Sequence, residues 1–184
     1  MRFKKILKEF PILPTSALIF YLVLVLLWNL NLIPPPTEVV NFLEDLYNQY
    51  GLFGLSIASF LEGVVYLGLY FPGSFIIALA VFLSDGSFIS LISISIVVAI
   101  TLTITSFINY FLGRRISIKK KDIEKHKKPS KGLFLSMLHP NILALYFFNA
   151  GLERKGLWKV AYVPLIMVPY GFLVAYLLFA LSDF

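Results

Sequence analysis

The chain has 184 residues, a net charge of +6 and no cysteine. Hydrophobic residues make up 59% of it and charged residues 14%, whereas soluble domains carry roughly 25% charged residues. With a mean hydropathy of +0.85, this composition excludes an ordinary soluble globule, and the missing cysteines exclude disulfides and thiolate chemistry. We expect an all-α, polytopic integral membrane protein with one compact domain.

All Lys and Arg residues fall in three blocks, at residues 2–8, 114–131 and 154–159. Cytoplasmic loops of membrane proteins collect Lys and Arg, so these blocks, including the N-terminal segment 1–14, should face the cytoplasm. No nucleic-acid partner is expected, because the basic residues flank apolar stretches and no soluble fold presents them. The absence of Cys and the abundance of Ile, Leu and Lys suit a prokaryotic cell membrane.

The first apolar stretch, Thr15–Ile33, is long enough to cross a bilayer core and ends at three prolines. A cleaved signal peptide is the alternative. We favour an uncleaved transmembrane helix running outward, since the apolar region is too long and no small-residue cleavage site follows it.

Residues 37–50 show a different pattern, with apolar side chains on one helical face and acidic or amide side chains on the other. This periodicity predicts an amphipathic helix lying along the outer membrane interface. Thr37 is its expected N-cap, with Glu38 in the first turn.

Glu62 is the only charged residue between Gly51 and Ser84, and it precedes Phe71-Pro72-Gly73 by about ten residues. A carboxylate in such a stretch is costly unless it faces protein or water, so it is a candidate functional group. Pro72 removes a helical hydrogen bond and Gly73 permits a turn, which predicts a helix break there.

Charge placement decides how this segment crosses the membrane. A single crossing would put Arg114 and the lysines after it on the outer side, against the charge rule. A re-entrant hairpin over 51–84, entering from the outer face with its tip near Pro72, places Arg114 and these lysines on the cytoplasmic side, as the charge rule expects. Two tight full spans would give the same result and stay open as an alternative.

Residues 88–113 then form a true span that is rich in Ser and Thr, whose hydroxyls can bond back to their own helix. Asn109 is its one amide. The basic loop 114–131 follows, and it can attract anionic lipid headgroups. The alternative is that the loop only sets the topology.

The same reasoning applies to the second half of the chain. His139-Pro140-Asn141 falls at the centre of an apolar segment, and Arg154, Lys155 and Lys159 follow it. A second re-entrant hairpin, over 132–152 and from the inner face, keeps these charges inside. A last span, 157–181, is expected to kink at Pro164 and Pro169.

The order hairpin and span therefore occurs twice, with the hairpins entering from opposite faces. Such an inverted repeat with two broken segments predicts a binding site near the midplane, between the halves.

These residues resemble the DedA family, also described by its VTT domain and as SNARE-associated membrane proteins, over roughly Val39–Leu181. Glu62 with Pro72-Gly73, Tyr110-Phe111-Leu112-Gly113-Arg114 and Pro140 with Ala150-Gly151 match its motifs. The chain departs from the family at several charged positions, where it has Ser74, Thr105-Ser106, Met137 and Leu143. The resemblance implies movement of lipids or lipid-linked carriers across membranes, in bacteria often with proton dependence.

We therefore expect a flippase- or scramblase-like transporter of a phospholipid or polyprenyl-phosphate lipid, whose headgroup crosses a polar path between the hairpin tips. Membrane lipids are the expected partners, protons are possible ones, and an oligomer is compatible with the pattern. The path candidates are Glu62, Ser74, Ser106, Asn109, Tyr110, Arg114, His139 and Asn141, and the residues that shape the tips are Pro72, Gly73 and Pro140.

Three alternatives stay open. The chain could be a proton- or ion-coupled carrier of a small solute, or a membrane assembly protein that transports nothing. Each path candidate could also be purely structural: Glu62 bonded to hydroxyls, Arg114 an interfacial anchor, His139 a satisfied polar tip. An enzyme is the least expected reading, since no nucleophile, base and orienting group come together, and no cofactor or metal is expected.

Overall fold

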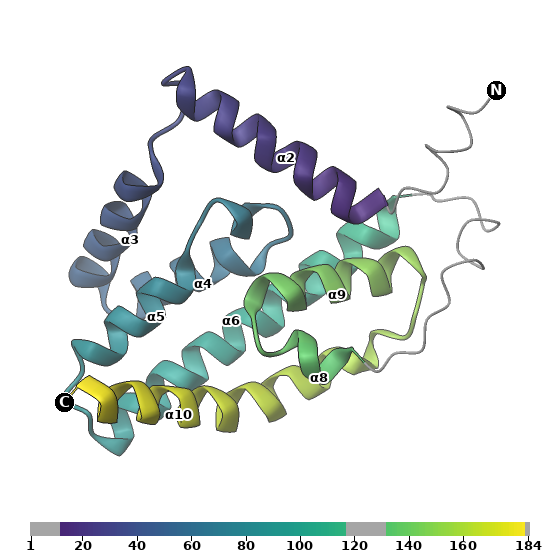
Figure 1. Ribbon diagram of the computed structural model, residues 1–184. Helices are drawn as coiled ribbons and strands as arrows, with labels where there is room; N and C mark the ends of the chain where they lie inside the picture. The colour runs from purple at the N-terminus through teal and green to yellow at the C-terminus, as the bar shows by residue number, and fades with distance from the viewer. Residues whose placement is uncertain (1–11, 117–131, 183–184) are drawn as a thin grey trace, which may run out of the picture.

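The computed structural model describes residues 12–116 and 132–182 (Figure 1). In these residues every regular element is a helix and no strand occurs, which confirms the predicted all-α class. Residues 1–11 and 117–131 lie outside the described part, and with them most of the predicted N-terminal segment and basic loop.

Helices α2 (Ile12–Asn29) and α3 (Pro36–Tyr50) are joined by the proline-rich turn. The predicted N-cap at Thr37 is wrong: Pro35 takes the N-cap position without a side-chain bond and Pro36 opens the helix, where its missing N–H is no loss. The predicted apolar face of α3 exists, with Val39 and Leu43 buried, and α3 packs against α4 and α5.

The first hairpin consists of α4 (Leu52–Gly63), the short 3-10 helix η1 (Leu67–Leu69) and α5 (Gly73–Phe82). The sequence predicted a helix break at Pro72-Gly73, but the break in the structure includes more residues. The backbone is already extended at Val64, with φ −88° and ψ 130°, and Tyr66 has a φ of 70°. The break therefore occupies residues 64–72, and Pro72 marks only its end.

Helix α6 (Phe88–Arg115) forms the centre of the molecule and packs against α4, α9 and α10. Ser87 caps it by accepting a hydrogen bond from the Ser90 amide at 3.2 Å. The predicted back-bonding of its hydroxyls is confirmed, for example by Ser95 Oγ donating to the Leu91 carbonyl at 2.8 Å. Five hydroxyls of this helix thus have their partners within the helix itself, namely those of Ser95, Thr101, Thr103, Thr105 and Ser106.

The second hairpin is lopsided. Its first described arm is the single turn α8 (Leu133–Ser136), and its second is α9 (Pro140–Leu152). The break predicted at His139-Pro140-Asn141 lies at residues 137–139, between α8 and α9. Pro140 occupies the first position of α9, which its fixed φ favours.

The last element begins as the 3-10 helix η3 (Leu157–Ala161) and continues as α10 (Tyr162–Ser182). Pro164 falls in the first turn of α10, where no helical hydrogen bond is lost, so the kink expected there has no cause. The α-helix runs on through Pro169. The segments Phe88–Arg115 and Leu157–Leu181 are long and apolar enough to cross a membrane.

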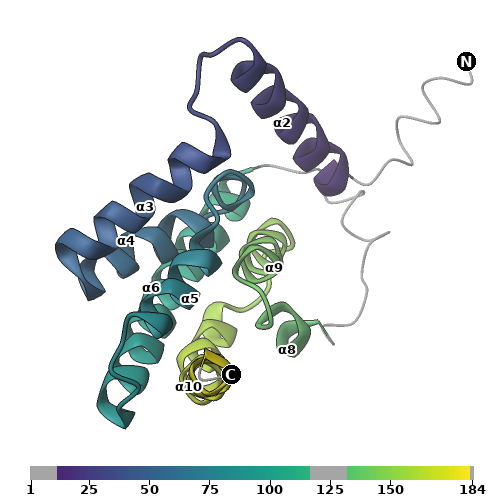
Figure 2. The same ribbon diagram turned by 60° about the vertical axis from the view of Figure 1, so that its left-hand side comes forward.

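The packing of the two halves is reciprocal. Helix α6 packs against α9 and α10 packs against α5, so each long helix contacts the second arm of the other hairpin. Gly151 of α9 lies against the Tyr110 carbonyl near the end of α6, whereas Gly86, after α5, lies against Phe179 of α10. Helices α5 and α9 thus start near the middle and run to opposite ends of the molecule (Figures 1 and 2).

Candidate functional site

Glu62 lies in the last turn of α4 with its side chain 2% exposed. Ser74, in the first turn of α5, donates a hydrogen bond from Oγ to Glu62 Oε1 at 2.5 Å. Gly73 explains the close approach, because a Cβ added there would lie 2.9 Å from both Cβ and Oε2 of Glu62. The start of α5 therefore packs directly against the carboxyl group of Glu62. Any side chain at residue 73 would push α5 away from that carboxyl group.

Two buried oxygens in this region have no hydrogen-bond partner: Glu62 Oε2 and Ser59 Oγ. Ser59 precedes Glu62 by three residues on α4, so the two side chains share one face of that helix. Among the described residues no Lys, Arg or His forms an ion pair with Glu62, and no group of three metal-ligating side chains occurs. The carboxyl is thus a buried acid with spare hydrogen-bonding capacity.

Asn109 holds the end of α4. This amide is 0% exposed, and it donates from Nδ2 to the Gly63 carbonyl at 2.7 Å and accepts from the Val65 amide through Oδ1 at 2.9 Å. These are backbone groups that the end of a helix leaves without partners. One side chain from α6 thus replaces the hydrogen bonds that α4 loses when it breaks.

Asn141 joins the two breaks. Its Nδ2 donates to the Gly68 carbonyl in the first hairpin at 3.0 Å, and its own backbone N–H donates to His139 Nδ1 at 3.2 Å. Gly68 also lies against the Glu62 carbonyl, so a Cβ there would collide with both Glu62 and Asn141. The structure therefore brings together Glu62, Ser74, Asn109, His139 and Asn141.

A cavity of about 260 Å³ adjoins this junction, between α5, α6, α10 and the second break. Ser74 and His139 contribute to its wall from the two hairpins, and both are exposed. Its other polar lining residues are Ser95 and Tyr170, and none of the residues that line it is charged. The cavity thus connects the Ser74–Glu62 pair to a mostly apolar space.

Three predicted path residues lie elsewhere. Ser106 is buried and donates its hydroxyl to the Leu102 carbonyl at 2.6 Å, which is a packing role. The Tyr110 hydroxyl donates to the Lys155 carbonyl at 2.5 Å, which fixes the turn after α9 to the end of α6. Arg114 is exposed at that same end.

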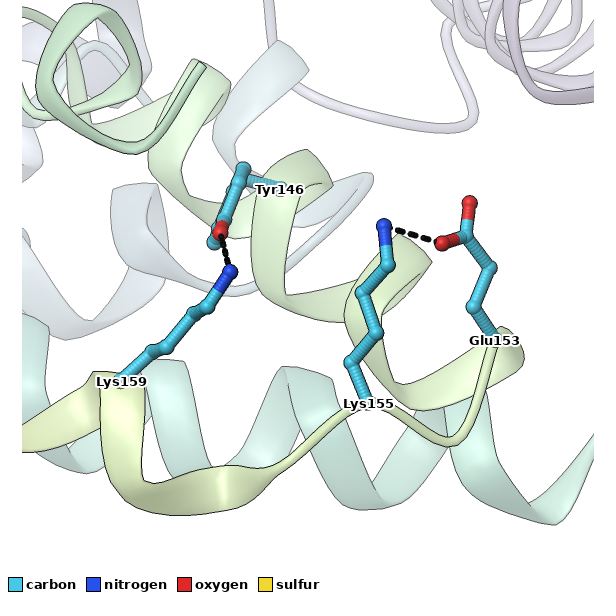
Figure 3. A network of polar contacts seen from close by, with 4 residues as sticks. All are labelled: Tyr146, Glu153, Lys155 and Lys159. Atoms are coloured by element: carbon cyan, nitrogen blue, oxygen red, sulfur yellow. Dashed lines mark hydrogen bonds and ion pairs between the residues drawn. The ribbon is translucent and has the colours of Figure 1, made fainter. Parts of the chain in front are cut away.

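A polar network surrounds the turn after α9 (Figure 3). Lys155 forms an ion pair with Glu153, and Lys159 Nζ donates to the Tyr146 hydroxyl at 3.2 Å. Lys159 Nζ also lies 5.9 Å from the centre of the Tyr146 ring. Lys155 lies in the turn after α9 and Lys159 lies on η3, so neither belongs to a helix break.

Sequence reasoning missed Ser59, Gly68 and most of the cavity wall. Two signals were available: Ser59 stands three residues before Glu62, the one charged residue of the stretch 51–84, and Gly68 is an isolated glycine within an apolar run, a sign of close backbone approach. The cavity wall from α6 and α10 had no such signal, because its apolar residues do not differ from those that pack elsewhere on the same helices.

In comparisons with protein-family models, curated proteins and solved structures, nothing matches this chain.

Proposed function

We propose that this chain is a polytopic integral membrane protein that moves a phospholipid or polyprenyl-phosphate lipid across the bilayer. The membrane part of the proposal is supported by the two helices long enough to cross. It is also supported by large apolar side chains that face outward, such as Ile89 at 74% and Leu165 at 69% exposure. Exposed apolar surface of this kind suits a lipid environment. The location proposed is a prokaryotic cell membrane, with the N-terminus in the cytoplasm.

The re-entrant arrangement is supported by helix lengths. Helices α4, α5 and α9 have 12, 10 and 13 residues, whereas a transmembrane helix needs about 20. None of the three crosses alone, which favours hairpins over two tight full spans in residues 51–84. The reciprocal packing of α6 on α9 and of α10 on α5 is what an inverted repeat of hairpin and span requires.

The single observation that carries the transport proposal is the meeting of the two breaks beside Glu62. Non-helical backbone at membrane depth is tolerated only inside protein or along a cavity, and broken helices at a repeat interface are where transporters bind substrate. Here the Asn141–Gly68 bond joins the breaks, and the Ser74–Glu62 pair lies at the cavity. A headgroup would cross along these polar groups while its tails stay in lipid.

The resemblance to the DedA family adds to the choice of a lipid as substrate, and membership in that family stays a prediction. The cationic side chains at the end of α6 and after α9 would meet anionic headgroups at the inner surface. The described residues that would do so are the exposed Arg114, Arg115 and Arg154, with the half-buried Lys155 and Lys159 beside them.

The test is lipid movement in reconstituted vesicles that contain a fluorescent phospholipid, read by dithionite quenching. Wild-type protein should speed the loss of inner-leaflet fluorescence over protein-free vesicles, and Glu62→Gln should slow it at least about ten-fold, or about 1.4 kcal/mol of barrier. Glu44→Gln, the same change at a half-buried acid of α3 outside the proposed path, is the matched control and should keep the wild-type rate. Equal rates in wild-type and protein-free vesicles would reject the proposal.

A second candidate function is a proton- or ion-coupled carrier of a small solute. The observation that favours it is the pair of buried oxygens without hydrogen-bond partners, Glu62 Oε2 and Ser59 Oγ, whose lone pairs could hold a transported proton or cation. Uptake of a water-soluble substrate that depends on a pH gradient, with no lipid movement, would select this function. A protein with neither activity would instead be a membrane assembly partner.

A further inference from the structure

We propose that the cavity between α5, α6, α10 and the second break binds one hydrocarbon chain of a lipid. The inference rests on the proposed function only in placing the protein in a bilayer. It adds which part of a lipid is held, and where. The headgroup path at the breaks and the chain site in the cavity are separate claims with separate tests.

The chemistry of the wall favours a hydrocarbon. Its apolar lining comes from three helices and includes Ile77, Ala78, Val98, Met167, Val174 and Leu178. No Lys, Arg, Asp or Glu lines it, so a charged headgroup would meet no counter-charge inside. A methylene chain, in contrast, gives up no hydrogen bond or counter-charge on entering, and it packs against apolar side chains.

Three of the four polar residues of the wall already have a hydrogen bond. Ser95 donates to the Leu91 carbonyl, Ser74 donates to Glu62, and His139 Nδ1 accepts from the Asn141 amide. Ser74 and His139 are exposed, so they mark the side on which the cavity opens toward the breaks. A lipid whose chain lies in the cavity would therefore have its polar end at the junction of the hairpins.

The size of the cavity limits the ligand to part of a lipid. Its volume of about 260 Å³ is slightly below the roughly 300–1,000 Å³ of pockets that enclose whole small molecules. A complete phospholipid does not fit, and a segment of a single acyl or polyprenyl chain does.

Two substitutions would fill the cavity from different helices. Ala78→Phe adds a ring from α5 and Val174→Phe adds one from α10, and both residues line the wall and are half-buried. Ala180→Phe is the matched control, because Ala180 is half-buried on the same helix as Val174 and does not line the cavity. Size-exclusion chromatography in detergent reports whether each variant folds.

The experiment is photolabelling in phosphatidylcholine vesicles that contain a phosphatidylcholine with a diazirine at the middle of one acyl chain. Labelled residues are then identified by peptide mass spectrometry. Met137 and Met167 line the cavity and are 2% and 5% exposed, so lipid on the outer surface does not reach them. Leu173 and Leu177, exposed on α10, serve as internal standards for surface labelling.

We expect label on Met137 and Met167 in the wild type. It should fall about ten-fold or more in Ala78→Phe and in Val174→Phe, because filled volume excludes the chain, and should persist in Ala180→Phe. The inference is overturned if wild-type methionines carry no label, or if both filling variants are labelled like the wild type. Labelled protein that moves no lipid would reject the proposed function and keep the chain site, and unlabelled protein that moves lipid would do the reverse.

Discussion

The two hairpins solve the same problem, a helix that stops inside the fold, in different ways. The first hairpin breaks over residues 64–72, and its freed backbone groups are bonded by amide side chains from other elements, Asn109 on α6 and Asn141 on α9. The second breaks over a few residues and is capped locally, with His139 as N-cap and Pro140 at the first position of α9.

The break of the first hairpin thus depends on tertiary contacts, whereas the break of the second is determined by its local sequence. The first also contains Tyr66 in the left-handed region, with a φ of 70°, a conformation that non-glycine residues adopt at a cost. The acid, Glu62, belongs to the tertiary-dependent break. The shape of the first hairpin therefore depends on side chains of α6 and α9, whereas the second hairpin has its cap within its own sequence.

The largest expected effect is that of Asn109→Leu. It leaves the Gly63 carbonyl and the Val65 amide buried without partners, which should lower the free energy of unfolding by about 2–6 kcal/mol, roughly 1–3 for each group. Denaturant unfolding in detergent measures the loss. Asn149→Leu, the same change at a half-buried site on α9, should lower the free energy of unfolding much less. Equal losses in the two variants would contradict the role of Asn109 in bonding the end of α4.

Gly68→Ala should be next in size. The added Cβ meets the Asn141 side chain and the Glu62 carbonyl, so overpacking should cost about 1–3 kcal/mol and push the breaks apart. Gly132→Ala is the control, since a Cβ there meets nothing within 4 Å. Thermal unfolding of the two variants compares them, and a Gly68→Ala protein as stable as Gly132→Ala would argue against close contact of the hairpins.

His139→Ala tests the locally capped break. Loss of the N-cap bond to the Asn141 amide should cost about 1 kcal/mol, and His139→Asn should recover most of it, because Asn is a favoured N-cap. Thermal unfolding measures the stability of both His139 variants. No rescue by Asn would mean that His139 stabilises α9 by some other contact.

The smallest effect concerns Asp85, in the turn between α5 and α6. Hydrogen bonds from the Ser90 side chain and the Ser87 backbone lower the pKa of this exposed carboxyl below its ordinary value. Its contribution to stability is therefore present above the unfolded-state pKa and is lost as the pH falls through the lower folded-state pKa. Asp85→Asn should remove that acid-side pH dependence, and an unchanged pH profile of unfolding would contradict the assignment.

Local patterns predicted the elements well and the contacts between them poorly. The apolar and hydroxyl-rich stretch 88–113 gave the centre of the fold, α6, to within two residues at its end. Pro140 and the acid before Pro72-Gly73 marked both breaks. Their extent was not predictable, because the stop after Gly63 depends on Asn109, which lies 46 residues further along the chain.

The candidate site divides in the same way. Glu62 was identifiable from its isolation in an apolar run, and its partner Ser74 from its place after the Pro-Gly pair. Tyr110 and Arg114 are candidates through the motif that resembles the DedA family, and Ser106 is one as a polar residue of an apolar helix. The structure assigns Ser106 and Tyr110 to helix packing and turn fixation instead. Sequence alone does not tell which polar residues of one helix face a cavity.

The central claim is that the two hairpins enter the bilayer from opposite faces. Because the natural chain has no cysteine, Asp85→Cys and Lys155→Cys each create a unique label site. Asp85 precedes α6, and Lys155 is bonded to Tyr110 of α6, about 33 Å further along the helix at 1.5 Å per residue. In intact cells an impermeant maleimide should label Asp85→Cys, and should label Lys155→Cys only after permeabilisation. Labelling of both sites from the same side would contradict the claim.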